Sequence, residues 1–380
     1  MPPENDFLQL MGGWEGYQSI RGQTFTEAKV TKALDLINNR PGWPSHEWRY
    51  RFIEAITTTD FPYLLGHIID REVMARYKVA VADWQAYFRM RTLANFNTVR
   101  RHKIIGNDDR LPQVPEKGEY LVGEVAEGRY IYNLLKYGRQ FDISWESVIN
   151  DDLEAFSDVP ERMANAAIRT EAHNATSTFA SATGPNALLF GAPIVDVDGG
   201  AVTNLGVLPL TILNLETTLQ LMAAQTDVNG EPISVRGVHL VVPTPLEFTA
   251  RQILTSALKM WAESAGGAAT PYPMTNVVAQ QGINLHIDPY LQVVDTSGTN
   301  DTTWYLFAAP AQGAAMEFGR LRGHEGPEIC MKASDKVAVG GGPISPLEGD
   351  FATDNIFYRV RLVKGSCQLD PRFAYAQQAT

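Results

Sequence analysis

The sequence predicts a mixed α+β chain in which one segment has no core of its own. Three observations lead to this prediction. Residues 158–182 form one long helical pattern whose faces are mostly small or polar, residues 98–141 are charged and rich in turn residues, and helices and strands alternate from about residue 204. The length of 380 residues allows two or three subdomains. We therefore expect the charged segment to find its partners outside its own core.

Composition and charge exclude several classes of protein. The chain is 44% hydrophobic, but no run of about 18 apolar residues occurs, so no membrane span is expected. The first residues lack a basic region followed by an apolar core, so they are not a signal peptide, and we expect the chain to stay in the cytoplasm where it is made. A formal net charge of -11 argues against a protein that grips nucleic acid by neutralising phosphates.

Helices are expected ahead of the charged segment. Residues 24–40 are amphipathic, residues 46–57 have a helical pattern, and Thr57 to Asp60 mark the start of a further helix that runs to about residue 69. Residues 71–89 carry apolar and aromatic side chains that are spaced either for a helix or for a strand, and both interpretations remain open.

The charged segment 98–141 mixes apolar pairs with charges and with breakers such as Gly106 to Asp109. Its later parts, residues 121–125 and 129–135, are able to pair as strands. A loop of this length is uncommon within a compact domain and is usually functional or disordered, so we expect it not to fold against its own core. We expect the basic run from Arg100 to Lys103 to pair with acids of an adjacent subunit rather than with nucleic acid.

A strand and the long helix follow. Phe141, Ile143, Trp145 and Val148 nearly alternate with polar residues, which is typical of a strand. The stretch Asp158-Val159-Pro160-Glu161 is a helix-start signal, because Asp can cap the first turn, Pro is tolerated in it, and Glu can reach back to the cap. The predicted helix continues to about residue 182, and its thin apolar stripe leaves several faces available to partners.

The second half of the chain alternates helices and strands and ends in a long strand. Helices are expected at residues 210–225 and 245–262, strands at 237–242, 283–287, 291–294, 304–309 and 355–366, and a turn at 295–301.

Motifs for catalysis, cofactors and metals are weak throughout. The seven histidines are scattered without metal-ligand spacing, and Gly340 to Gly342 lack the context of a phosphate loop, so a flexible loop is expected there. Residues Asp196 to Gly200 resemble the beginning of a calcium loop, but the closing Glu is absent and a turn is the better interpretation. We therefore predict no catalytic, cofactor-binding or metal-binding residues.

Two further groups have plain structural explanations. Asp151, Asp152 and Glu154 form a carboxylate cluster at the start of a helix, where the helix dipole favours negative charge. Cys330 and Cys367 lie far apart in the sequence without ligands near them, and we expect both to be reduced and packed.

Specific motifs, however, resemble a known family. The segment from Tyr137-Gly138-Arg139 through Asn150-Asp151-Asp152-Leu153 into the long helix resembles the signature region of major capsid proteins of tailed bacteriophages, in particular the phage Mu-like head subunit group. The sequence FYRVRLVKG at residues 357–365, followed by Asp370-Pro371-Arg372, resembles the closing strand of that family. The similarity of organisation covers about residues 45 to 380, and the Asn-Asp-Asp-Leu region is its most specific part.

The resemblance implies the Hong Kong 97-type capsid fold. Its parts would be an N-terminal arm with helices (1–97), the extended loop (98–141), the peripheral domain with the spine helix (142–203), the axial domain (204–325), and the return to the peripheral domain with the C-terminal strand (326–380).

It also implies a function. The chain would be a major head protein without enzymatic activity or cofactor, which self-assembles as pentamers and hexamers into the icosahedral shell of a virion around double-stranded DNA. Assembly would take place in the host bacterial cytoplasm with a separate scaffold, a portal and decoration proteins, without a membrane, and with only non-specific contact to the DNA. Two alternatives stay open: an encapsulin-like nanocompartment that holds protein cargo, and a soluble α/β enzyme with a pocket in residues 204–325.

The resemblance places the inter-subunit contacts on the loop and near the start of the spine helix. The expected contact residues are Arg100, Arg101, Lys103, Lys117, Glu119, Arg129, Asp151, Asp152, Glu161 and Arg162. The type member of the family also links a loop lysine covalently to a neighbour. Lys103, Lys117 and Lys136 qualify for this by location alone, and we expect solvated lysines rather than a cross-link.

Overall fold

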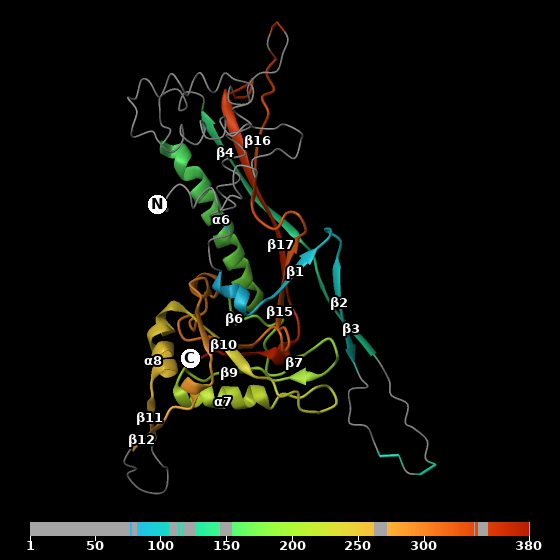
Figure 1. Ribbon diagram of the computed structural model, residues 1–380, viewed down its shortest axis with the longest axis vertical. Helices are drawn as coiled ribbons and strands as arrows, with labels where there is room; N and C mark the ends of the chain where they lie inside the picture. The colour runs from blue at the N-terminus through green and yellow to red at the C-terminus, as the bar shows by residue number, and fades with distance from the viewer. Residues whose placement is uncertain are drawn as a thin grey trace, which may run out of the picture. The chain divides into compact units, whose positions relative to one another are not determined.

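A computed structural model describes a large part of the chain (Figure 1). The described residues are 77, 82–105, 113–114, 116–117, 126–144, 154–261, 272–337, 339–340 and 349–379. The helices expected between residues 24 and 69, the strand positions Trp145 and Val148, and the Asn150 to Leu153 motif lie outside these residues.

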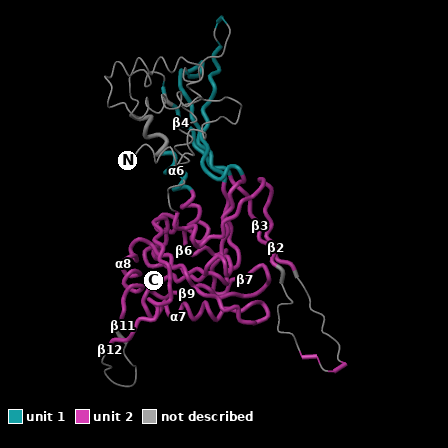
Figure 2. Tube along the Cα trace, in the orientation of Figure 1, with its two compact units in different colours: residues 1–81, 136–170, 323–363 teal, residues 82–135, 171–322, 364–380 magenta. Residues whose placement is uncertain are grey.

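The chain divides into two compact units, which Figure 2 distinguishes by colour. The first consists of residues 1–81, 136–170 and 323–363, and the second of residues 82–135, 171–322 and 364–380. The long helix α6 (Glu154–Phe179) and the long strand β17 (Asn355–Gln368) each contribute to both. The five predicted domain ranges are not tested by this division and stay predictions.

The second unit is built on a buried five-stranded sheet. Its order is β13 (Asn284–Ile287), β10 (Gly237–Val242), β14 (Trp304–Ala308), β18 (Ala374–Gln377) and β9 (Leu205–Gly206). Strand β10 is parallel to β13 and antiparallel to β14. Every residue of β14 is buried, which explains its continuous apolar sequence, because a strand covered on both faces has no polar side.

Each face of this sheet has its own core. On one face, Leu240 and Leu306 pack with residues of α7 (Ile212–Ala223) and α8 (Glu247–Thr255). On the other face, Phe307 packs with Phe179 at the end of α6 and with the aromatic residues around η3 (Asp83–Ala86). The ring of Tyr87 stacks on that of Phe307, with centroids 5.2 Å apart.

Smaller elements complete the second unit. Strand β1 (Arg89–Leu93) runs parallel to β15 (Met316–Leu321), which is antiparallel to the C-terminal half of β17. The long ribbon of β2 (Val99–Ile105) and β3 (Ala126–Tyr132) follows β1 in the sequence. The remaining elements are the pairs β5 (Ala180–Ser181) with β6 (Gly184–Pro185), β7 (Ile194–Val195) with β8 (Ala201–Val202) and β11 (Leu258–Trp261) with β12 (Tyr272–Thr275), and the short helices η4 (Thr244–Leu246), η5 (Val278–Gln280), α9 (Leu291–Val294) and η7 (Pro371–Phe373).

In the first unit, too, a helix packs on a sheet. The N-terminal half of β17 pairs with β16 (Glu328–Met331) and with β4 (Leu135–Ser144). Met163 and Ala164 of α6 pack against Phe141, Ile329 and Val360. The small apolar stripe of α6 thus covers this sheet.

Most of the periodic segments form the elements that their sequence predicts. The helix expected at 210–225 is α7, the strands expected at 237–242, 283–287 and 304–309 are β10, β13 and β14, and the long final strand is β17. The strand expected around Phe141 is β4, and mixed α+β content is confirmed.

Three predicted elements are wrong in detail. Helix α6 begins at Glu154, so Asp158 lies inside it and is not its cap; one missing N–H at Pro160 does not stop a 26-residue helix. The helix expected at 245–262 ends at Thr255, because Ser256 is extended and the next residues pair as β11 with β12. The strand expected at 291–294 is the short helix α9, preceded by a turn in which the Asp288 carboxylate accepts a hydrogen bond from the Tyr290 amide at 2.8 Å.

Two further expectations need correction. The flanks of the charged segment do pack on their own unit, because β2 and β3 pair over 99–105 and 126–132 and Tyr132 is buried beside Cys367. Residues 129–132 therefore pair with 99–102, and the expected partner 121–125 lies outside the described residues. Both cysteines are free, but only Cys367 is packed, since Cys330 is exposed on β16.

Candidate functional site: a ribbon with two faces

The β2–β3 ribbon presents two different faces. Arg101 lies opposite Tyr130 and Val99 opposite Tyr132, whereas Arg100 lies opposite Ile131 and His102 opposite Arg129. Because successive side chains of a strand point to opposite faces, the register sorts the ribbon into an inner face, which includes Arg101, Lys103, Tyr130 and Tyr132, and an outer face, which includes Arg100, His102, Arg129 and Ile131.

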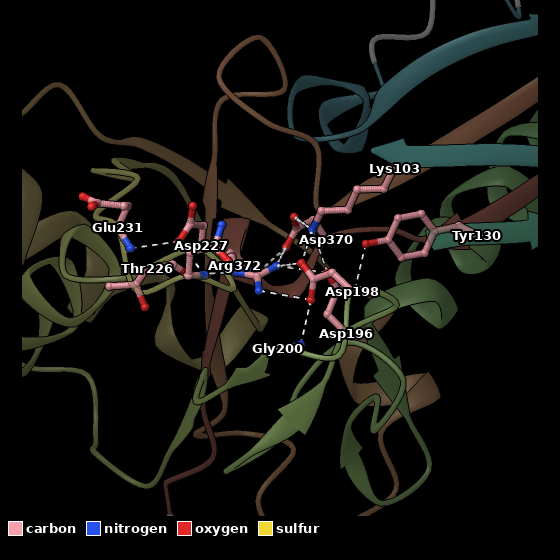
Figure 3. A network of polar contacts seen from close by, with 11 residues as sticks. Lys103, Tyr130, Asp196, Asp198, Gly200, Thr226, Asp227, Glu231, Asp370 and Arg372 are labelled. Carbon is pink, nitrogen blue, oxygen red and sulfur yellow. Dashed lines mark hydrogen bonds and ion pairs between the residues drawn. The ribbon is translucent and has the colours of Figure 1, made fainter. Parts of the chain in front are cut away.

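Lys103 is held on the inner face by three carboxylates (Figure 3). Its Nζ lies 2.7 Å from Asp196 Oδ2, 2.9 Å from Asp198 Oδ2 and 2.5 Å from Asp370 Oδ2. The Tyr130 hydroxyl donates a hydrogen bond to Asp196 Oδ1 at 2.7 Å. One residue from each ribbon strand is thereby tied to the body of the second unit.

The same three carboxylates are already joined by Arg372. Its Nη1 lies 3.0 Å from Asp196 Oδ2, 2.8 Å from Asp198 Oδ2 and 3.4 Å from Asp370 Oδ1. Its Nε donates to the backbone oxygen of Thr226 at 2.9 Å. A side chain at Gly200 would collide with this guanidinium, because a Cβ there would stand 2.5 Å from Nη2. We call Asp196, Asp198, Asp370 and Arg372 the acidic cradle.

Burial and charge act against each other in the cradle. Burial by itself would raise the pKa of Asp198, but hydrogen bonds from Arg372 and Lys103 outweigh burial and lower that pKa to about 2. Burial would lower the pKa of Lys103, but the charge of Asp370 and the hydrogen bonds to the three carboxylates raise it. Both groups are therefore ionised around neutral pH, and the contact is an ion pair.

A second anchor lies along the inner face. The carboxylate of Glu317, which is fully buried on β15, accepts hydrogen bonds from Arg101 Nε at 2.7 Å and from the Tyr132 hydroxyl at 2.6 Å. Burial would lower the pKa of Arg101, but the hydrogen bond and charge of Glu317 raise it. Arg101 and Lys103 thus both bind acids of their own chain.

The outer face is exposed in the isolated chain. Arg100 and Arg129 are exposed, Ile131 is 50% exposed, and His102 Nδ1 lies 2.9 Å from Glu127 Oε1, both side chains being exposed. An exposed face with cationic groups beside an apolar side chain is suited to binding an acidic protein surface.

The structure therefore separates the predicted contact residues. Arg101 and Lys103 bind acids of their own unit. The side chains of Arg100, Arg129, Lys117, Arg162 and Lys136 are exposed. Glu161 lies in α6, and Glu119, Asp151 and Asp152 lie outside the described residues. Contacts of the predicted residues with a neighbouring subunit stay predictions.

Sequence reasoning missed the acidic cradle and Glu317. The turn at Asp196 to Gly200 is confirmed, with the Gly199 amide donating to the Asp196 backbone oxygen at 2.9 Å, but its carboxylates were given no role. The motif Asp370-Pro371-Arg372 is part of the family resemblance. Its Asp370 contacts Lys103, and its Arg372 contacts the carboxylates of the cradle. No signal pointed to Glu317, because its partners are about 200 residues away in the chain.

Among the described residues, features of a ligand pocket, a metal site or a membrane span are few. A surface cavity of about 460 Å³ lies between α7, residues 234–237 and η5, but Glu216 at its edge pairs with Lys259, and Arg236 donates to the Gln281 backbone oxygen at 2.5 Å. Among the described residues, His, Cys, Asp and Glu side chains form no group of three or more arranged to hold a metal. None of the described helices is long and apolar enough to cross a bilayer.

Comparison with family models identifies one family. The family model described as phage capsid protein matches residues 129–377. No curated protein matches the sequence. Similar solved structures include the capsid of the cyanophage P-SCSP1u (13% identity, 78% of this chain and 88% of that chain, TM-score 0.47), the mature capsid of bacteriophage PhiM1 (8%, 80% and 88%, 0.48), and the SrpI encapsulin of Synechococcus elongatus PCC 7942 (10%, 79% and 88%, 0.44).

Proposed function

The chain belongs to the phage capsid protein family and is a shell protein, and on this premise we propose that it forms the icosahedral head of a tailed phage around double-stranded DNA. In this proposal the subunits have the Hong Kong 97-type fold and associate as pentamers and hexamers. The role of the chain is mechanical, with no catalytic residue. The phage Mu-like subgroup stays a prediction.

The observation that supports a role in assembly is the difference between the two faces of the ribbon. The inner face binds Glu317 and the acidic cradle of its own unit, and the outer face leaves Arg100, Arg129 and Ile131 exposed. A ribbon that is fixed on one side and exposed on the other is suited to lie over a neighbouring subunit. We propose that this outer face, together with Lys117 nearer the tip and Arg162 on α6, contacts that neighbour.

Repetition makes a modest contact sufficient. A single exposed ion pair contributes only about 0 to 1 kcal/mol. In a closed symmetric shell each subunit makes the same contact with its neighbour, and later contacts become effectively intramolecular. The outer face can therefore direct assembly without holding two isolated subunits together.

The partners follow from charge and symmetry. The net charge of -11 is compatible with loose, non-specific contact between the shell and packaged DNA, which must not adhere tightly to the wall. A separate scaffold, a portal and decoration proteins belong to the same proposal, as does assembly in the host cytoplasm.

Charge reversal on the outer face tests the proposal. We expect R100E and R129E each to leave the subunit folded and to reduce shell formation, measured by sedimentation and electron microscopy. The matched control is R322E, an exposed arginine of the same unit outside the ribbon, which should assemble. Normal shells from R100E and R129E would exclude the outer face as a contact.

The content of isolated wild-type particles tests the second part. We expect nuclease-protected double-stranded DNA inside. A packaged protein instead of DNA would contradict the phage head and would support a nanocompartment.

A further inference from the structure

We propose that Lys103 is a positioning residue: its insertion into the acidic cradle sets the direction in which the β2–β3 ribbon leaves the body. This inference rests on the proposed function, because a direction matters only if the ribbon must reach a neighbour. It assigns Lys103 to the subunit's own geometry and not to the interface between subunits.

The cradle contains a cation of its own besides Lys103. Arg372 touches all three carboxylates, and its side chain is 4% exposed, as fits a permanent part of the body. Lys103 adds a second cation to the same oxygens and is 26% exposed. The three carboxylates outnumber Arg372, so the cradle attracts a further positive charge. Removal of Lys103 leaves each carboxylate in contact with Arg372.

Position along the ribbon makes Lys103 the decisive anchor. Arg101 and Tyr132 are bound to Glu317, near the root of the ribbon, and Lys103 lies two residues further toward the tip on β2. Two charged anchors along one face fix the direction of a strand, whereas a single charged anchor permits it to swing. Tyr130 also contacts Asp196, through a single neutral donor.

The cross-strand neighbour supports the same assignment. Lys103 lies opposite Gly128, which has no side chain to reach the body. Only the β2 strand therefore contributes a side-chain anchor at this register. Glu127, the next β3 residue toward the tip, belongs to the outer face, where it pairs with His102.

Hydrogen exchange on the full-length chain, kept unassembled at low concentration, tests the anchor. K103M keeps the length of the side chain and removes its charge. We expect ribbon amides at 99–105 and 126–132 to exchange about tenfold to a hundredfold faster in K103M, with β10 and β14 unchanged, because a charge-assisted contact is lost locally. K103R should restore slow exchange, and R100M, on the outer face, should leave it unchanged.

Assembly of the same variants then tests positioning. We expect K103M to give few or irregular shells and K103R to give regular ones. A loosened ribbon with regular shells would overturn positioning by Lys103 and leave the proposed function intact. Unchanged exchange in K103M would overturn the anchor, and failure of K103M to fold would show that Lys103 belongs to the body's core. The proposed contact of the outer face fails if R100E and R129E both form normal shells, and the proposed phage head fails if wild-type particles hold protein instead of DNA.

Discussion

Gly138 of β4 lies directly against the backbone of Val360 in β17, so that a Cβ at this position would stand 2.7 Å from the Val360 carbonyl oxygen. Gly138 is the glycine of the Tyr-Gly-Arg motif, and this close approach gives the motif a physical reason. Because the obstructing atom is backbone, no rotamer change relieves the clash. We expect G138A to lower the free energy of unfolding of the first unit by about 1–3 kcal/mol, measured by urea denaturation.

The control for this substitution is G298A in the second unit. No heavy atom lies within 4 Å of a Cβ built there, and the residue has no positive φ. We expect a change within about 0.5 kcal/mol. Equal effects from the two substitutions would show that the close approach to Val360 does not matter.

Elements with a local sequence pattern were predicted correctly, whereas contacts between residues far apart in the sequence were missed. Strand β10 and helix α7 carry their period within a few residues, so both were found. The pairing of β2 with β3 was missed, because it joins residues on either side of about twenty others, and an equally plausible partner for β3 lay closer. Local signals also misled at Asp158, where capping residues occur inside a continuous helix.

The candidate site shows the same limit. The basic run was predicted to pair with acids of an adjacent subunit, whereas Arg101 and Lys103 pair with acids of their own unit. A sequence cannot say whether these two side chains face their own unit or a neighbour. The alternation of strand residues would have divided the run into two faces had the pairing been known. Asp196 meets Arg372 only through the tertiary fold, because the two residues are 176 positions apart.

The pair His239 and His286 predicts a loss of stability in acid. His239 Nδ1 lies 2.9 Å from His286 Nε2 on the neighbouring parallel strand, and both rings are buried. Burial and the charge of His286 lower the pKa of His239 to about 4, and burial lowers that of His286. The unfolded chain takes up protons below about pH 6.5, where the folded chain does not, so stability should fall from there to about pH 4.

We expect the histidine pair to lower the free energy of unfolding by roughly 2–3 kcal/mol at pH 4. The measurement is the urea midpoint of the unassembled chain at several pH values between 7 and 4. H239Q should flatten the pH dependence even if it changes stability at pH 7. R322Q is the control, because Arg322 is exposed and lies outside the histidine pair, so the slope should stay as it is. An unaltered slope in H239Q would contradict the assignment.

Arg372 should contribute far more to the stability of the body than Lys103. The R372M substitution leaves the nearly buried carboxylates of Asp196 and Asp198 without their permanent cation. Removal of one partner from a buried ion pair costs about 3–5 kcal/mol. Urea denaturation should show a loss of this size for R372M and a change within about 0.5 kcal/mol for the exposed R322M. A loss in K103M as large as that in R372M would mean that the cradle does not form without the ribbon.

Cys367 offers a direct report on whether the ribbon is closed. It packs with Tyr132 and Leu369, with Val99 against the same cluster, so two ribbon residues cover it. Burial and the charge of Glu317 raise the pKa of its thiol to about 12. Since the thiolate is the reactive form, Cys367 should resist alkylation while the ribbon is docked.

The chain has two cysteines, and the other, Cys330, is exposed, so C330S leaves Cys367 as the single thiol. In unassembled C330S we expect alkylation at pH 8 to be slow and to become complete on unfolding. In C330S with Y132A, which removes the ring that covers the thiol, alkylation should be at least about tenfold faster, because access then requires only local opening. The outer-face substitution R129A is the matched control and should leave the rate unchanged. Rapid alkylation of C330S alone would show that the inner face of the ribbon does not stay packed on the body in solution.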